Sequence, residues 1–167
     1  MKKFQSSRGW RNNNPMNIRR TRTEWQGLVA RQNRTDREFC QFLNRTWGYR
    51  AAYKVLRSYY KFFAQQGREC TIRAVVERWA PRTENDTGEY LLRVCQLISY
   101  EYGGSENPES CLYGGNSQGD DLHHAWLMAA MTCVECGCRP EDVDYRAICS
   151  GIMLAGGHKL NPEEVRL

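Results

Sequence analysis

The residues best suited to chemistry lie near the end of the sequence, in the stretch TCVECGC, where one glutamate stands among three cysteines. We expect Glu135 at the C-terminal end of a helix whose other face carries Trp, Leu, Met and Val side chains. Burial in the protein and the negative end of the helix dipole would both raise the pKa of the carboxyl group. Such a carboxyl keeps its proton closer to neutral pH and can act as a general acid.

The cysteines around this glutamate suggest a metal site at first sight. Cys133 and Cys136 have the C-x-x-C spacing of a zinc-binding pair, but the second pair that a structural zinc site normally has is missing. The chain holds eight cysteines without the framework of a small secreted scaffold. We therefore expect no metal and no cofactor, and we expect most thiols to pack as small hydrophobic side chains.

A second polar stretch, RGWRNNNPMNIRR, runs from Arg8 to Arg20 and contains four asparagines. An asparagine side chain carries both a donor and an acceptor, and the residue tolerates left-handed and turn conformations. These side chains could fix the backbone of their own loop, since Asn-Pro commonly starts a turn. They could equally present amides to a ligand rich in hydroxyl and acetamido groups. Both interpretations remain open.

Helical patterns surround these stretches. Residues 46–67 place aromatic and aliphatic side chains at i, i+3 and i+4, and Gly67 ends the pattern. A second helix is predicted from Thr71 to the residue before Pro81, and a third after Asp86, with Glu89 closing a capping box. Further helices are predicted from a cap at residue 120 or 121 to residue 137, and from residue 140 to residue 157.

The remaining segments complete one domain, residues 1–167, with a mainly α fold and a small β-wing (α+β). Residues 8–45 contain short apolar-polar alternations separated by turn residues, which predict the asparagine loop and the β-wing. Residues 46–100 and 120–157 are the helical parts, and residues 101–119 read as a surface loop. A cleft between wing and helices would be a natural ligand site.

The charge and the hydrophobicity of the chain restrict the kinds of partner that it can bind. The chain has 41% hydrophobic and 26% charged residues, as in ordinary soluble domains. No segment is long and apolar enough for a membrane span, and the N-terminus lacks the apolar region of a signal peptide. The net charge of +5 suits an anionic polymer, either nucleic acid or cell wall. Nucleic acid is the less favoured partner, because the arginines are spread along the chain.

The asparagine stretch and its continuation, RGWRNNNPMNIRR…EWQGL, resemble the R-G-x-R-N-N-N-P-G-N-I-R…W-x-G signature of lysozyme-like proteins from bacteriophages and prophages. Many of these are labelled phage structural proteins or peptidoglycan hydrolases. The resemblance continues in FCQFLNRTWGYRAAYKVLRSYY and RWAPRTENDTGEYLLRVC, and resumes in LMAAMTCVECG. Two residues depart from the pattern, because Met16 replaces a glycine and Cys136 replaces an asparagine beside the glutamate.

The resemblance implies a lysozyme-like fold and a glycosidase that degrades peptidoglycan, of the muramidase, glucosaminidase or lytic transglycosylase type. Because the asparagine segment precedes the glutamate, the fold would be a circular permutation of the order in many lysozyme-like enzymes. Glu135 would be the general acid. Glu84 and Asp86 are candidates for the second carboxylate, although Asp86 also suits the cap of the following helix. Asp36 and Glu38 in the wing are further candidates. The implied substrate-binding residues are Asn13, Asn14, Asn17, Trp25, Asn85 and Tyr90.

An alternative is a non-catalytic virion or interaction protein that keeps the fold, and the departures at Met16 and Cys136 favour it. The expected partners are peptidoglycan glycan strands and other virion proteins. The expected location is the host cytoplasm, followed by action at the cell wall or carriage in the virion. A nucleic-acid-binding module would require arginines converging on one face.

Overall fold

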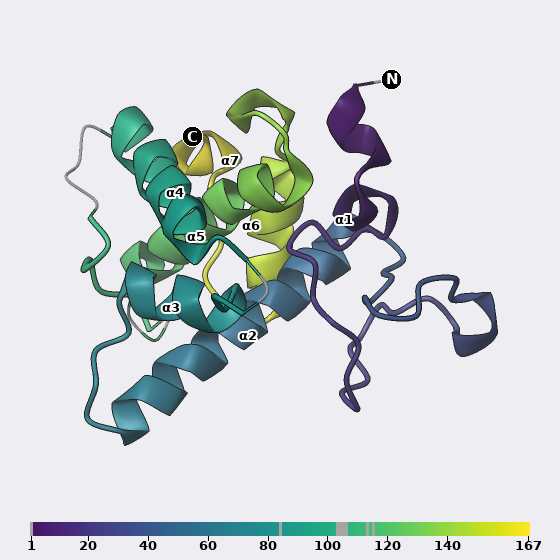
Figure 1. Ribbon diagram of the computed structural model, residues 1–167, viewed down its shortest axis with the longest axis horizontal. Coiled ribbons are helices and arrows are strands. Elements are labelled where there is room, and N and C mark those ends of the chain that lie inside the picture. The colour runs from purple at the N-terminus through teal and green to yellow at the C-terminus, as the bar shows by residue number, and fades with distance from the viewer. Residues whose placement is uncertain (1, 84, 103–106, 113, 115) are drawn as a thin grey trace.

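The computed structural model describes residues 2–83, 85–102, 107–112, 114 and 116–167. Helices dominate this part of the chain, which confirms the prediction of a mainly α protein (Figure 1). The α-helices are α1 (Arg8–Arg11), α2 (Arg45–Gln65), α3 (Ile72–Trp79), α4 (Thr87–Tyr102), α5 (Gln118–Cys136), α6 (Tyr145–Leu154) and α7 (Pro162–Val165). Short 3-10 helices are η1 (Lys3–Ser6), η2 (Arg31–Asn33) and η3 (Pro140–Asp142). No described helix is long and apolar enough to cross a membrane.

Helix α5 forms the centre of the molecule, because it contacts α1, α2, α4, α6 and α7. Leu127, Met128 and Met131 on this helix are fully buried. A helix with apolar residues on all sides must be surrounded by other elements, and each such side chain contributes about 1.5–3 kcal/mol when it is buried. The central position of α5 therefore fixes the place of its C-terminal residues within the fold.

Helices α2 and α6 pack closely along one another. A Cβ atom at Gly151 of α6 would lie 2.8 Å from the amide nitrogen of Arg50 and 2.9 Å from the carbonyl oxygen of Thr46, both on α2. Glycine at this position therefore allows the two backbones to approach. The long α2 runs beneath α5 and α6 in Figure 1, and the N-terminal segment lies beside its first turns.

Most helix boundaries agree with the sequence. The Thr71 hydroxyl accepts a hydrogen bond from the amide of Ala74, and the Asp86 carboxylate accepts one from the amide of Glu89. Gly67 follows the end of α2 with a φ of 63°. Side-chain acceptors satisfy the free amides of a first helical turn, and glycine adopts the left-handed conformation without strain.

The predicted start of α5 was wrong. Its cap is Ser117, whose hydroxyl accepts from the Asp120 amide at 3.1 Å, while the Asp120 carboxylate accepts from the Ser117 amide at 3.2 Å. Asp121, the other candidate, is fully buried inside the molecule and accepts hydrogen bonds from Tyr53 and His158. A serine and an acid three residues later form a reciprocal capping box, which moves the start of the helix to Gln118.

The last predicted helix is divided in two. Residues 140–142 form the 3-10 turn η3, and α6 begins at Tyr145. The Asp144 carboxylate accepts a hydrogen bond from the Ala147 amide at 3.0 Å and so caps a new helix. Helix α7, which was not predicted, follows at residue 162.

The predicted β-wing is not a sheet among the described residues. Residues 8–45 contain α1, η2 and two isolated antiparallel bridges, Arg19 with Phe39 and Leu28 with Phe42. Side chains take up backbone groups that a strand ladder would use, since one Gln41 oxygen accepts from the amides of residues 35 and 36 at 2.7 and 2.9 Å. We call residues 12–44 the irregular wing.

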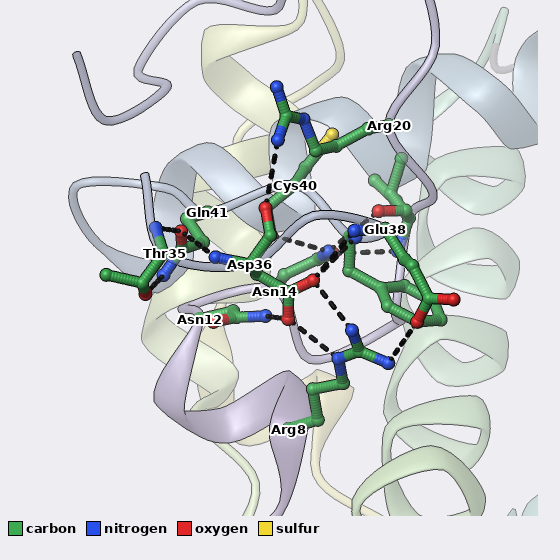
Figure 2. Close-up of polar contacts among 11 residues, drawn as sticks. Arg8, Asn12, Asn14, Arg20, Thr35, Asp36, Glu38, Cys40 and Gln41 are labelled. Atoms are coloured by element: carbon green, nitrogen blue, oxygen red, sulfur yellow. Dashed lines mark hydrogen bonds and ion pairs between the residues drawn. The ribbon is translucent and has the colours of Figure 1, made fainter. Parts of the chain in front are cut away.

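An ion-pair cluster fastens α1 to the irregular wing (Figure 2). Arg8 donates to both oxygens of Asp36 at 2.7 and 2.8 Å and to Glu38 at 2.7 Å, and the Asn12 amide also donates to Asp36. The hydrogen bond from Arg8 is the main reason why the pKa of Asp36 lies well below its usual range. These two acids therefore hold the wing in place.

The predicted surface loop of residues 101–119 is described only in part, because residues 103–106, 113 and 115 lie outside the described residues. Helix α4 extends to Tyr102. The described portion is attached to the start of α3. Cys111 and Thr71 form an isolated antiparallel β-bridge, and the Leu112 amide donates to the Cys70 carbonyl at 2.7 Å. Leu112 is buried, so this part of the loop belongs to the core.

Candidate functional site

Three side chains converge on the carboxylate of Glu135, in the last turn of α5. One oxygen, Oε1, accepts hydrogen bonds from the Trp79 indole nitrogen at 3.2 Å and from the Tyr90 hydroxyl at 2.9 Å. The other, Oε2, accepts from the Asn17 amide nitrogen at 2.8 Å. The donors come from α3, from α4 and from residues 12–17 of the irregular wing, which we call the asparagine loop. The carboxylate therefore joins segments that are distant in the sequence.

The pKa of Glu135 is raised above its ordinary value because burial penalises the charged form. The hydrogen bonds from Asn17, Tyr90 and Trp79 favour the ionised form and oppose part of this shift. Burial also raises the pKa of Tyr90 well above its usual value, so its hydroxyl stays protonated. Glu135 is therefore a carboxyl group that keeps its proton at a higher pH than an exposed glutamate and has a fixed orientation.

Glu135 faces a pocket of about 680 Å³ between the irregular wing and the helices. The sequence predicted a cleft at this place, and a volume of this size is typical of a ligand site. Aromatic and polar side chains share the lining, with flat rings next to amide, hydroxyl and guanidinium groups. The lining includes Asn17, Arg19, Thr21, Thr23, Trp25, Phe39, Tyr59, Arg78, Trp79 and Asn85.

Asn14 does not reach the pocket, and the prediction that it binds a ligand was wrong. It is completely buried, its amide nitrogen donates to the carbonyls of Ile18 and Cys40 at 2.9 and 3.0 Å, and its oxygen accepts from the Ile18 amide at 2.9 Å. Asn13 donates to the carbonyls of Phe42 and Leu43 at 3.1 and 3.3 Å and is not part of the pocket lining. Both asparagines therefore fix the loop.

Asn17 is the asparagine that faces the pocket. Its φ of 49° lies in the left-handed region, which asparagine tolerates better than most residues. Because a carboxylate only accepts, the amide nitrogen of Asn17 must be the atom that points at Glu135. The amide oxygen is buried without a hydrogen-bond partner among the described residues. It lies next to Gly9, where an added Cβ would be 2.8 Å from this oxygen.

The two departures from the lysozyme-like pattern both serve the packing of the loop. Met16 is buried in the core with an exposed fraction of 1%. The Cys136 thiol donates to the Pro15 carbonyl at 3.3 Å, and burial raises the pKa of this thiol to about 12. Cys136 thus attaches the asparagine loop to the end of α5.

The other predicted site residues have different outcomes. Trp25 and Asn85 line the pocket, and Tyr90 contacts the acid through its hydroxyl. Glu84 lies outside the described residues. Glu135 is the one residue with a carboxyl side chain in the described lining. Asp86 does not line this pocket, and its carboxylate accepts a hydrogen bond from the Glu89 amide at the start of α4.

From the sequence, Trp79 could either stack on a sugar ring or pack in the core. In the structure it is half-buried, lines the pocket and donates from its indole nitrogen to Glu135. Several other lining residues were not identified from the sequence. Tyr59 and Arg78 also line the pocket. Two signals in the sequence could have indicated them. Tyr59 lies one helical turn after Val55, and Arg78 directly precedes Trp79.

The cysteines agree with the expectation of buried thiols. All eight are free, and all except Cys111 are buried. Among the residues that the structure describes, no group of three or more His, Cys, Asp or Glu side chains could hold a metal ion.

Fold and site together define a mainly helical protein with a partly buried carboxyl group in the lining of a pocket of aromatic and polar side chains. No family model matches the chain. The chain is similar to Protein P5 of Pseudoalteromonas phage PM2, with 36% identity over 90 residues, which are 52% of this chain and 52% of that protein. The chain thus spans about half the length of the curated relative it matches. This similarity supports a phage origin.

Proposed function

We propose that the protein is a phage glycosidase that cleaves peptidoglycan glycan strands, with Glu135 as the general acid. The observation that carries this proposal is the carboxyl group of Glu135, which is partly buried, has a raised pKa and accepts hydrogen bonds from three donors in the pocket. Cleavage of a glycosidic bond requires an acid that can protonate the leaving oxygen. The protonated form of Glu135 supplies that proton.

The pocket has features that suit a chain of sugar rings. Trp25 and Trp79 offer aromatic rings on which sugar rings can stack. Asn85 and Thr21 offer hydrogen-bonding groups for hydroxyl and acetamido substituents. A volume of about 680 Å³ has room for a short stretch of glycan. These properties support binding of peptidoglycan strands rather than a small charged metabolite.

The resemblance to lysozyme-like phage proteins supports the same activity, and the asparagine loop gives it a physical basis. Asn17, the asparagine of the motif that points into the pocket, orients the acid. Asn13 and Asn14 hold the loop that positions Asn17. The proposed roles of this motif are therefore orientation of Glu135 and, at Asn17, contact with the glycan.

A specific observation favours a second candidate, a non-catalytic phage virion or interaction protein that keeps the glycan pocket. Glu135 is the single carboxyl group in the described lining, and both of its oxygens already accept hydrogen bonds. The name of the similar phage protein, Protein P5, refers to no enzymatic activity. In this candidate, Glu135 and Asn17 anchor the loop, and the pocket binds the wall without cutting it.

The two candidates are separated by incubating purified sacculi with the native protein, with Glu135→Gln and with Glu77→Gln. The last variant is the matched control, because Glu77 is an exposed glutamate on α3 that does not line the pocket. The glycosidase predicts soluble muropeptides from the native and control proteins and none from Glu135→Gln. Mass spectrometry of the new ends then identifies the bond. Equal release by all three proteins would refute the role of Glu135, and sedimentation with sacculi without release would favour the second candidate.

A further inference from the structure

We infer that Arg78 binds a carboxylate of the glycan, so that the pocket selects acidic wall polymer over neutral polymers of N-acetylglucosamine. This inference rests on the proposed function and names the substrate class of the same pocket. Arg78 lies in the last turn of α3, directly before Trp79, and both residues line the pocket that contains Glu135. An anion bound by Arg78 would therefore lie in the pocket occupied by the sugar.

Two aromatic rings hold the guanidinium of Arg78. It lies 3.9 Å from the ring centre of Phe62 and 4.9 Å from that of Tyr59, both on α2. Stacking of this kind contributes about 0.5–1 kcal/mol at exposed sites and uses the face of the guanidinium. The N–H groups of a guanidinium lie in its plane. Those of Arg78 donate to no other side chain or carbonyl within the described residues, and Arg78 is exposed. The rings thus fix the orientation of the group before any ligand binds.

Arg78 has no ion pair within the part of the chain that the structure describes, although it lies at the pocket beside Trp79. Arg73, on the same helix, donates to Glu109 at 2.6 Å, and Arg8 is occupied by Asp36. A stacked arginine with unused N–H groups at a pocket is suited to a planar anion, because its fork matches the two oxygens of a carboxylate.

The charge of the pocket supports the same ligand. The charged side chains of its described lining are Arg19, Arg78 and Glu135. When Glu135 is protonated, as a general acid must be, the described lining carries only positive charge. A positive pocket attracts an acidic polymer and increases its rate of association.

Peptidoglycan carries carboxylates in two places, on the lactyl ether of muramic acid and on the stem peptide. Both are absent from chitin, which has the same acetamido groups and ring size. The shared chemistry is the carboxylate, and the two sources can be separated by ligands that contain one or the other. The neutral chitin oligomer is the reference for binding through the sugar rings alone.

The test is calorimetric titration of the full chain carrying Glu135→Gln, which keeps the ligands intact. Three ligands are compared. The first is chitotetraose. The second is a peptide-free tetrasaccharide of alternating N-acetylglucosamine and N-acetylmuramic acid, and the third is that same tetrasaccharide with stem peptides. Each is measured again after adding Arg78→Gln, Arg78→Lys or Arg68→Gln. Arg68 is the matched control, because its guanidinium is 5.0 Å from the Phe63 ring centre and it is not part of the pocket lining.

We expect at least one acidic tetrasaccharide to bind about fivefold to tenfold more tightly than chitotetraose. Arg78→Gln should remove this preference, so that the acidic ligands bind no more tightly than chitotetraose does. Arg78→Lys should keep part of the preference, and Arg68→Gln should keep all of it. A preference for the peptide-free ligand identifies the lactyl carboxylate, and a preference confined to the peptide-bearing ligand identifies the stem peptide.

Equal affinity for all ligands would overturn the inference and leave a glycan pocket without charge selection. Retention of the preference in Arg78→Gln, or its loss in Arg68→Gln as well, would also overturn it. Absence of binding by every ligand would refute the proposed function together with the inference. Binding of all ligands with equal affinity would refute the inference alone, so the two failures can be told apart.

Discussion

Replacement of Tyr90 by phenylalanine tests how the pKa of Glu135 is set. The change removes one hydroxyl that donates to the carboxylate at 2.9 Å and leaves the ring in place. A hydrogen bond to a charged group contributes about 1.5–3 kcal/mol, against about 1 kcal/mol for a neutral pair. The ionised form of Glu135 therefore loses about 0.5–2 kcal/mol more than the protonated form. At about 1.4 kcal/mol per unit, the pKa of Glu135 should rise by about one unit.

The same change makes the stability of the protein depend more strongly on pH. Because the pKa of Glu135 in the folded protein lies above its ordinary value of 4.5, protonation of this group favours the folded state. Its contribution is complete below that value and is lost as the pH rises through the folded pKa. Tyr90→Phe raises the folded pKa further, so the variant should lose an additional ~0.5–2 kcal/mol at neutral pH that it does not lose in acid.

Two measurements test this reasoning. The pKa is read from the carboxyl carbon of Glu135 by NMR titration of protein labelled in its glutamates, and the free energy of unfolding is read from urea denaturation in acid and at neutral pH. The control is Tyr59→Phe, which removes another hydroxyl from the pocket lining that does not donate to Glu135. An unchanged or lower pKa in Tyr90→Phe, or an equal shift in the control, would show that the hydroxyl does not stabilise the carboxylate.

Other changes test the loop and the thiols. Gly9→Ala should weaken glycan binding and destabilise the protein by about 1–3 kcal/mol, because its Cβ would lie 2.8 Å from the Asn17 oxygen and displace it; Gly119→Ala, which has room at 3.7 Å, should be neutral or stabilising in the same denaturation assay. Asn14→Ala should cost about 1–3 kcal/mol of unfolding free energy, since it leaves buried backbone groups without partners; a cost below 0.5 kcal/mol would contradict this account. An aromatic disulfide reagent should label Cys111 first and the other thiols only after unfolding, and mass spectrometry of the labelled peptides would expose any faster site.

The helices could be predicted because their signals are local. Thr71, Asp86 and Gly67 are recognisable caps and stops, and the apolar spacing between them follows the helical period. The start of α5 was missed because Ser117 and two acids compete for one cap within four residues. The burial of Asp121 against Tyr53, which depends on tertiary contacts, removes one candidate, and Asp120 serves as the partner of Ser117 in the capping box.

The site could be predicted in part, since the motif residues Asn17, Trp25 and Asn85 do surround one pocket with Glu135. The division of labour among the asparagines could not be predicted, because it depends on which backbone carbonyls lie within reach of each amide after folding. The irregular wing was misread as strands for a related reason. Its alternation of polar and apolar residues is real, but side chains such as Gln41 occupy the backbone groups that would pair.

The three donors to Glu135 also set the order in which the site can form. They lie 118, 56 and 45 residues away in the sequence, at Asn17, Trp79 and Tyr90. Contacts of such separation form only after long loops have closed, and closure has an entropic cost that local helices do not bear. The helical body can thus acquire much of its secondary structure while the carboxyl group remains solvated and titrates like an ordinary glutamate. A raised pKa at Glu135 is therefore a signature of the completed fold, and local opening of the asparagine loop would abolish it while the helices persist.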